Sequence, residues 1–234
     1  MKNLRKFVVT LAVLLVALLC LTATVSAAEI VDSGTCGDNL TWTFDSDDVL
    51  TISGTGDMYD YSFDADGTPA PWPRAKIKKV IVEEGVTSIG TSAFALDLYE
   101  VEEFVLPNTL KVIRERAFEL NIMTEITIPD SVTEIHFAAL SSCKNLETVK
   151  LSKNLKVIPD YLFSDCHSLE TIVIPEGVTK IGNGAFQICK ALKYVELPDS
   201  LTTIGAYAFY QCAGLTDISI PERVSEIHNE AFYQ

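Results

Sequence analysis

Residues 192–212 read LKYVELPDSLTTIGAYAFYQC, and this pattern recurs through most of the chain. Its most regular column is an isoleucine that returns every 22 to 24 residues. The column consists of Ile89, Ile113, Ile135, Ile158, Ile181, Ile204 and Ile227. A period in the twenties is typical of a solenoid, in which each unit buries its apolar face only by stacking on its neighbours. We therefore predict a predominantly β solenoid of about seven coils of about 23 residues over residues 77–234.

Each unit begins with a short strand that a proline usually ends. Val195 and Leu197 alternate with Tyr194 and Glu196, the period-two pattern of a half-buried strand. Pro198 follows, and proline cannot donate a hydrogen bond to a strand ladder. A turn and a second short extended piece come next, so each coil is expected to be built from short parallel strands.

An alanine–phenylalanine pair closes most coils. Alanine permits close approach of the chain, while the ring fills the coil interior. The pairs are Ala93-Phe94, Ala117-Phe118, Ala185-Phe186, Ala208-Phe209 and Ala231-Phe232. We interpret these columns as packing positions. The pattern also predicts that the last coil is incomplete, because Gln234 precedes the position of the next cysteine.

Four cysteines, Cys143, Cys166, Cys189 and Cys212, lie 23 residues apart and therefore share one column. Disulfides and a metal site are the functional alternatives. Zinc sites favour clustered pairs such as C-x-x-C, and parallel side chains in a ladder are poorly placed for disulfides. The sequence favours free, buried thiols, and no metal site is predicted.

The amino-terminal residues fall into two segments. Residues 1–27 combine a basic start, a short apolar run over 7–21 and a small-residue end, which predicts a cleaved secretory signal. The alternative is a membrane anchor, but the run is shorter than the ~20 apolar residues that a spanning helix needs. No membrane insertion is expected after cleavage. Residues 28–76 lack the repeat, and strands at 41–44 and 49–53 are predicted to form a β cap for the solenoid.

The charge balance restricts the possible partners. Without residues 1–27 the chain holds 15 Lys plus Arg against 32 Asp plus Glu, a net charge of about −17. Nucleic acid and anionic membrane both require a positive surface, so neither is an expected partner.

No catalytic or cofactor-binding residues are predicted. His136 and His228 fill the position after the recurrent isoleucine and are expected on surface turns. His167 follows Cys166, but no third group completes a cysteine–histidine nucleophile. The expected class is therefore a non-enzymatic protein.

The outward side chains of the first strand are the candidate binding residues, because they vary where the interior repeats. Several are apolar where solvent is expected, which can mark an interaction surface. Ordinary β-propensity is the alternative explanation. The candidate ligand face comprises Ile81, Val105, Glu125, Lys150, Val173, Tyr194 and Glu196.

The consensus L-x-x-I-x-I-P-x-x-V-x-x-I-G-x-x-A-F-x-x-C over residues 77–234 resembles the BspA-type leucine-rich repeat of bacterial surface and secreted proteins. The resemblance implies a leucine-rich solenoid and, for some members, adhesion. We expect a secreted or cell-surface binding or adhesion protein that presents a concave strand face to an extracellular protein or glycan. The alternative is a non-catalytic structural or targeting module of a larger exported enzyme.

Overall fold

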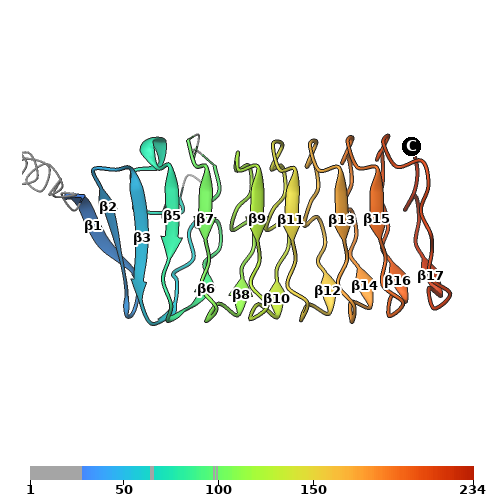
Figure 1. Cartoon of the computed structure of the whole chain (residues 1–234), viewed down its shortest axis with the longest axis horizontal. Helices are drawn as coiled ribbons and strands as arrows, with labels where there is room; N and C mark the ends of the chain where they lie inside the picture. Colours follow the sequence, from blue (N-terminus) through green and yellow to red (C-terminus); the bar gives the residue numbers. More distant parts are fainter. Residues whose placement is uncertain (1–27, 64–65, 97, 99) are drawn as a thin grey trace, which may run out of the picture.

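The computed structural model describes residues 28–63, 66–96, 98 and 100–234. The predicted signal peptide lies outside these residues. Figure 1 shows an amino-terminal group of longer strands followed by a row of coils. Within the part that the structure describes, no helix has the length and apolarity needed to cross a membrane.

The amino-terminal strands extend the solenoid sheet. They are β1 (Ile30–Gly37), β2 (Leu40–Asp45), β3 (Val49–Gly54) and β4 (Gly56–Asp57), and a short 3-10 helix η1 (Arg74–Lys76) follows. β1, β2 and β3 pair in antiparallel fashion, and β3 then pairs in parallel with β5 (Lys79–Val82), the first strand of the repeats. The two predicted strands are confirmed as β2 and β3, whereas β1 was not predicted. Most β1 side chains are exposed, so it lacks the alternation that marks a half-buried strand.

Two columns of parallel strands run along the solenoid. The first column contains β5, β7 (Glu103–Val105), β9 (Glu125–Thr127), β11 (Thr148–Lys150), β13 (Thr171–Val173) and β15 (Tyr194–Glu196). The second contains β6 (Val86–Ile89), β8 (Val112–Ile113), β10 (Glu134–Ile135), β12 (Val157–Ile158), β14 (Lys180–Ile181), β16 (Thr203–Ile204) and β17 (Glu226–Ile227). Six coils carry both strands, and the seventh carries only β17 among the described residues. The predicted β solenoid is confirmed, with about six full turns.

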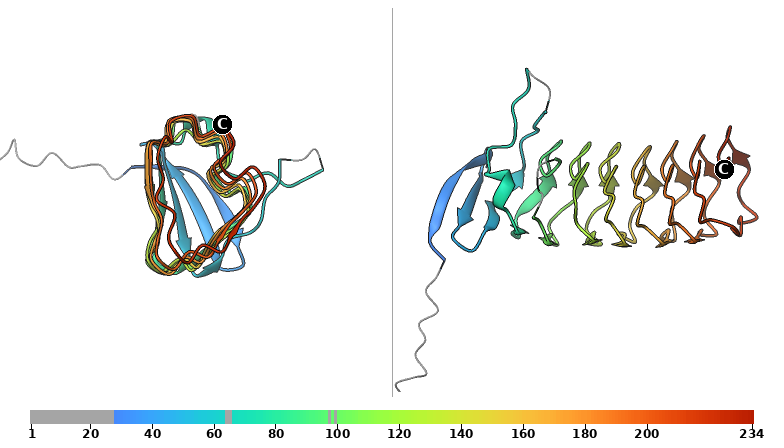
Figure 2. Two further views of the ribbon diagram at one scale, coloured as in Figure 1. Left: turned by 90° about the vertical axis from the view of Figure 1, so that its right-hand side faces the viewer. Right: turned by 90° about the horizontal axis from the view of Figure 1, so that it is seen from above.

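The coils follow one another in an almost straight row, and they superpose closely when viewed end-on (Figure 2). The concave face expected from the sequence is therefore wrong. Six coils carry a short parallel strand on both sides, and such two-sided coils favour a straight row over one that curves toward a single strand column.

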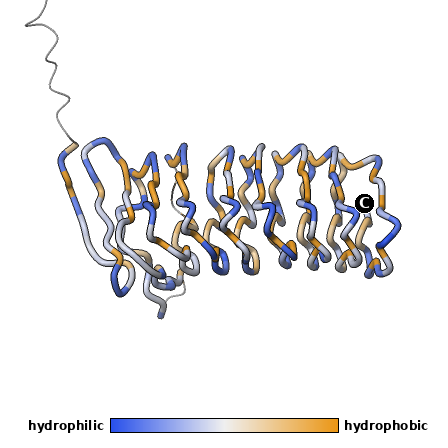
Figure 3. Tube along the Cα trace, turned by 60° about the horizontal axis from the view of Figure 1, so that its bottom comes forward, coloured by the Kyte–Doolittle hydropathy of each residue, from blue (hydrophilic) through white to orange (hydrophobic). Residues whose placement is uncertain are grey.

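The repeated apolar columns form the core. The isoleucine column is buried from Ile89 to Ile204, while Ile227 in the terminal coil is 52% exposed. Phe163, Phe186 and Phe209 stack at centroid distances of 5.4 and 5.2 Å. Figure 3 shows apolar and polar segments alternating around each coil, as stacking of amphipathic units requires.

The phenylalanine stack continues into the amino-terminal segment. Trp72 stacks on Phe94 at 5.3 Å, and Phe94 stacks on Phe118 at 5.7 Å. Trp72 also contacts Trp42 edge-on at 6.5 Å. Trp72 therefore takes the ring position of a preceding coil, a contact expected of a cap, although the capping role itself stays a prediction.

The cysteine column links each coil to the preceding one through hydrogen bonds. All five described cysteines are free, buried thiols, the arrangement that the sequence favours. Cys189 donates its thiol to the backbone carbonyl of Phe163 at 3.0 Å, and Cys212 does the same to Phe186. In the second coil Asn121 takes the cysteine position, and its amide donates to the carbonyl of Phe94 at 3.1 Å. The column therefore requires a buried hydrogen-bond donor, which a thiol or an amide can supply.

The strand columns are interrupted at three places. The first column lacks ladders between β7 and β9 and between β11 and β13, and the second lacks one between β10 and β12. Pro159 explains the missing ladder between β10 and β12. At the equivalent position of the next coil, the Gly182 N–H donates to the carbonyl of Ile158 in the preceding coil, and proline has no N–H to make this bond. The interruptions are staggered, so each pair of neighbouring coils keeps at least one ladder.

In each of the first six coils, the residues two before and two after the second residue of the Ala-Phe pair adopt a left-handed backbone. Gln211 has φ of 53° and is exposed, whereas Gln187 in the preceding coil has no positive φ. Left-handed geometry costs about 1–2 kcal/mol for a residue with a side chain and almost nothing for glycine.

We expect Gln211→Gly to raise the free energy of unfolding by about 0.5–1 kcal/mol, measured by urea denaturation, because the left-handed cost exceeds the entropic cost of glycine. Gln187→Gly is the matched control. It should destabilise the protein by at least a similar amount, since it adds glycine entropy without relieving strain and removes a hydrogen bond to Ser164. Equal effects of the two substitutions would contradict the strain argument.

Candidate ligand-binding face

The first strand column presents one continuous outward surface, which we call the strand face. In each strand an inward residue lies between two outward ones, because side chains alternate across a strand. The inward residues Ile126, Ile172 and Val195 are at most 5% exposed. The strand face comprises Lys79, Ile81, Glu103, Val105, Glu125, Thr127, Thr148, Lys150, Thr171, Val173, Tyr194 and Glu196.

All seven candidate residues lie on the strand face. Val173 and Tyr194 are 57% and 54% exposed, and Val105 is 38% exposed. The charged candidates Glu125, Lys150 and Glu196 are also exposed, whereas Ile81 is half-buried. Whether these residues bind a ligand stays a prediction.

The apolar candidates form two separate pairs. Ile81 lies directly opposite Val105 in the β5–β7 ladder. Val173 lies opposite Glu196, and Tyr194 lies opposite Thr171, so Val173 and Tyr194 are diagonal neighbours on β13 and β15. Diagonal neighbours are within reach of long side chains. The strand face therefore offers an apolar patch near each end of the row of strands, with Glu125 and Lys150 between them.

Ion pairs between neighbouring coils neutralise part of the surface charge. Lys79 pairs with Glu103 at 2.7 Å, and Lys153 pairs with Asp130 at 2.6 Å. Hydrogen bonds from the side chain and backbone of Lys153 lower the pKa of Asp130. None of the ion pairs among the described residues involves the candidates Glu125, Lys150 and Glu196, although the Lys150 charge also helps to lower the pKa of Asp130.

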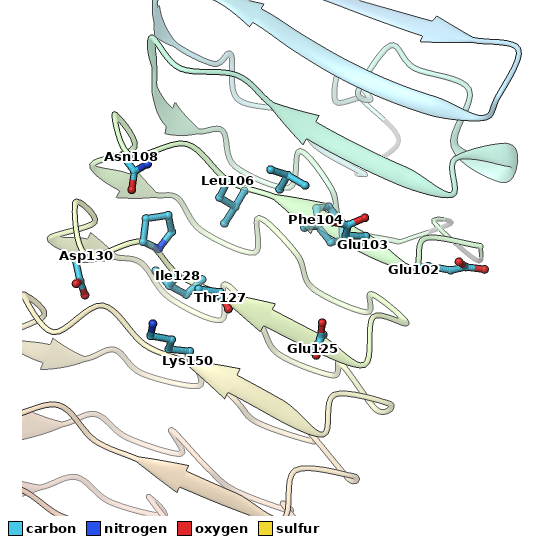
Figure 4. Close-up of a pocket in the computed structure, with 12 residues that line it drawn as sticks. Glu102, Glu103, Phe104, Leu106, Asn108, Glu125, Thr127, Ile128, Asp130 and Lys150 are labelled. Carbon is cyan, nitrogen blue, oxygen red and sulfur yellow. The ribbon is translucent and has the colours of Figure 1, made fainter. Parts of the chain in front are cut away.

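An open hollow of about 500 Å³ lies on the strand face between β7 and β9 (Figure 4). It brings together the candidates Val105, Glu125 and Lys150. Phe104, Leu106 and Ile128 line its middle, with polar side chains at both ends.

The hollow lies where the β7–β9 ladder is missing, and the unequal lengths of the loops that lead into the strands explain its place. The loop into β9 is one residue shorter than the loop into β11: Ile126 is five residues after Asn121, whereas Val149 is six residues after Cys143, the equivalent position. The spacing of 24 and then 22 residues between the first three isoleucines was the sequence signal, although it did not show which strands would separate. Phe104 occupies an inward position and packs edge-on against Phe118 at 5.1 Å.

A second hollow of about 330 Å³ lies beside β15 and includes Tyr194 and Glu196. Three candidates, Val105, Glu125 and Lys150, therefore share the first hollow, and Tyr194 and Glu196 share the second. Ile81 and Val173 line neither hollow.

The cysteines of the described chain are buried, and its histidines lie at or near the surface. Burial raises the pKa of Cys166 well above its ordinary value, and its thiol donates to the carbonyl of Leu140. His167 Nε2 lies 3.6 Å from Asp165. His228 is exposed and His136 half-exposed, on the corner after the isoleucine column. No group of three or more His, Cys, Asp or Glu side chains in the described ranges is placed to hold a metal ion.

Comparison with known proteins identifies the class of this solenoid. The profile of the BspA type leucine-rich repeat region matches residues 73–193 and 156–234, with six copies. The chain therefore belongs to the BspA-type leucine-rich repeat family, as the repeat pattern indicated.

Two bacterial leucine-rich repeat proteins have similar solved structures. The protein from T. pallidum has a TM-score of 0.59 at 26% identity, covering 79% of this chain and 92% of its own. The protein from Bacteroides ovatus ATCC 8483 has a TM-score of 0.58 at 23% identity, covering 80% of this chain. This chain spans only 59% of the length of the B. ovatus protein. No curated protein matches the chain.

Proposed function

We propose that this chain is a secreted or cell-surface, non-enzymatic binding protein that presents its strand face to an extracellular protein or glycan. One observation supports the proposal above others. Val173 and Tyr194 are more than half exposed and adjacent, in a fold whose interior columns repeat with little change. A contiguous exposed apolar patch flanked by charged side chains is a common feature of interaction surfaces.

The family supports the same function. Stacked repeats create an extended surface on which many side chains can vary without disturbing the core. In this chain the variation is concentrated on the strand face, where apolar, acidic and basic residues succeed one another. The acidic net charge favours solubility outside the cell and disfavours nucleic acid as a ligand.

We expect the double variant Val173→Ala/Tyr194→Ala to bind at least about tenfold more weakly to its ligand than the parent chain, because alanine removes most of the exposed apolar contact area. The measurement is binding of residues 28–234 to panels of purified extracellular matrix proteins and cell-wall glycans. Unfolding stability should change by no more than about 0.5 kcal/mol per site, as is usual for surface substitutions.

The matched control is Val157→Ala/Tyr207→Ala. Val157 and Tyr207 are 43% and 39% exposed, but they lie outside the strand face, on β12 and on a coil corner. This control should retain full binding. Full binding by the Val173→Ala/Tyr194→Ala variant would rule out the patch as the ligand site.

A further inference from the structure

We propose that the hollow between β7 and β9 binds an extended protein segment in which an arginine or lysine side chain lies beside an apolar one. The proposal rests on the proposed function and specifies which kind of ligand one part of the strand face accepts. It follows from three properties of the hollow: its unpaired carboxylates, its apolar middle and its interrupted backbone ladder.

Two carboxylates in the hollow form no ion pair at contact distance, although the Lys78 ammonium lies near enough to Glu102 for their charges to attract. Glu102 and Glu125 line it from the same end in Figure 4, and neither takes part in an ion pair within the described chain. The other two carboxylates are already paired, Glu103 with Lys79 and Asp130 with Lys153. A cationic side chain entering at the Glu102–Glu125 end would therefore meet two carboxylates that are in no contact ion pair.

The middle of the hollow is apolar. Val105 is 38% exposed and Leu106 is half-buried, and these two supply the accessible apolar surface, since Ile128 is only 1% exposed. An apolar ligand side chain placed there would bury surface that is now in contact with water. The hollow therefore fits a ligand that carries positive charge at one end and an apolar group next to it.

The backbone contributes further hydrogen-bonding groups. No backbone hydrogen bond in the described chain joins residues 103–106 to residues 125–128. By contrast, backbone hydrogen bonds do join β9 to β11 in the next pair of coils. Groups at an interrupted ladder must bond to water or to a ligand. A guanidinium group carries five N–H donors in one plane and suits both carboxylates and carbonyl oxygens.

The same features disfavour the other ligand classes. Anionic glycans and nucleic acids would be repelled by Glu102 and Glu125. Neutral glycans usually stack on exposed aromatic faces, whereas Phe104, the aromatic residue in this hollow, is half-buried against Phe94 and Phe118. A basic peptide is the ligand whose charge complements the hollow, and such complementarity also accelerates association.

The test is a titration of residues 28–234 with a capped Thr-Arg-Thr-Val-Thr peptide, followed by NMR of the backbone amides. In an extended chain its Arg and Val side chains point to the same face. We expect shifts centred on β7 and β9, including Leu106, and weaker binding as NaCl is raised, because salt screens exposed charges. The Thr-Glu-Thr-Val-Thr and Thr-Thr-Thr-Val-Thr peptides should bind at least about tenfold more weakly.

A charge-matched pair of variants tests the place of binding. Glu102→Gln/Glu125→Gln should weaken peptide binding about tenfold, which corresponds to about 1.4 kcal/mol. The control is Glu147→Gln/Glu222→Gln, at two sites outside the candidate ligand face. It removes the same charge from two exposed glutamates outside the hollow, and Glu147 holds the position of Glu102 in another coil. It should leave the affinity within about twofold of the parent chain.

Equal weakening in both variants would show diffuse attraction to an acidic surface and would overturn the proposal, as would equal binding of the acidic peptide. If Val173→Ala/Tyr194→Ala abolishes binding of a matrix protein or glycan while the basic peptide does not bind, this inference fails and the proposed function stands. If neither experiment finds a ligand on the strand face, both fail.

Discussion

Phe186→Ala is expected to lower the free energy of unfolding by about 3–5 kcal/mol, the usual cost of removing a buried phenylalanine side chain. Phe186 is fully buried and stacks between Phe163 at 5.4 Å and Phe209 at 5.2 Å. Alanine would leave a cavity in the middle of the ring column. Because each coil contacts only its neighbours, the loss cannot be shared across the whole molecule.

The measurement is urea denaturation of residues 28–234, with hydrogen exchange to locate the weakened coils. Phe137→Ala is the control, since Phe137 is 38% exposed and its ring lies against Tyr161 on the surface. We expect the control to cost less than about 1 kcal/mol, as most surface substitutions do. A similar cost for the two substitutions would contradict the assignment of the ring column as the core.

Alkaline pH is expected to unfold the protein between about pH 9 and pH 10.5, through its buried thiols. Burial raises the pKa of the Cys36, Cys143 and Cys212 thiols from 9.0 to about 12, and raises the pKa of Cys166 and Cys189 well above 9.0. The native state therefore keeps protons that the unfolded chain loses. The stability linked to these thiols is fully present below pH 9 and is lost as the pH rises toward 12.

Each thiol should remove about 1.4 kcal/mol of stability by pH 10, so the five together remove about 7 kcal/mol. That loss is comparable with the whole stability of many domains, about 5–15 kcal/mol. The measurement is urea denaturation in the presence of a reductant at pH 8, 9, 9.5 and 10.

Cys212→Ala provides the control, because it removes one titrating thiol. The fall in unfolding free energy between pH 9 and pH 10 should become smaller by about 1 kcal/mol. An unchanged slope would show that other groups cause the alkaline loss.

The repeated columns were predictable because each residue type has one structural task in every coil. The isoleucine and phenylalanine spacing predicted the stacked coils, and alternation along the first strand predicted which side chains point outward. The exposure of Val173 and Tyr194 agrees with that alternation. Strands β2 and β3 were predictable for the same reason, since each has one buried face.

Other features depend on neighbours in space and were not predictable from pattern. The absent ladder between β7 and β9 depends on how two loops of unequal length place their strands. The role of Asn121 was not predictable either: its amide donates to the carbonyl of Phe94, as the Cys143 thiol donates to the equivalent carbonyl of Phe118. The straightness of the row follows from the second strand column, which the repeat pattern showed only as a short extended piece.

The staggered ladder interruptions have a mechanical consequence. Where one column is broken, the other column still joins the two coils. Backbone hydrogen bonds beside the Ala-Phe pairs also cross each of these joints, as from the Phe118 N–H to the Ala139 carbonyl. The interruptions alternate between the two sides of the rod, at β7–β9, β10–β12 and β11–β13, so a load along the rod is carried at every joint by at least two sets of hydrogen bonds.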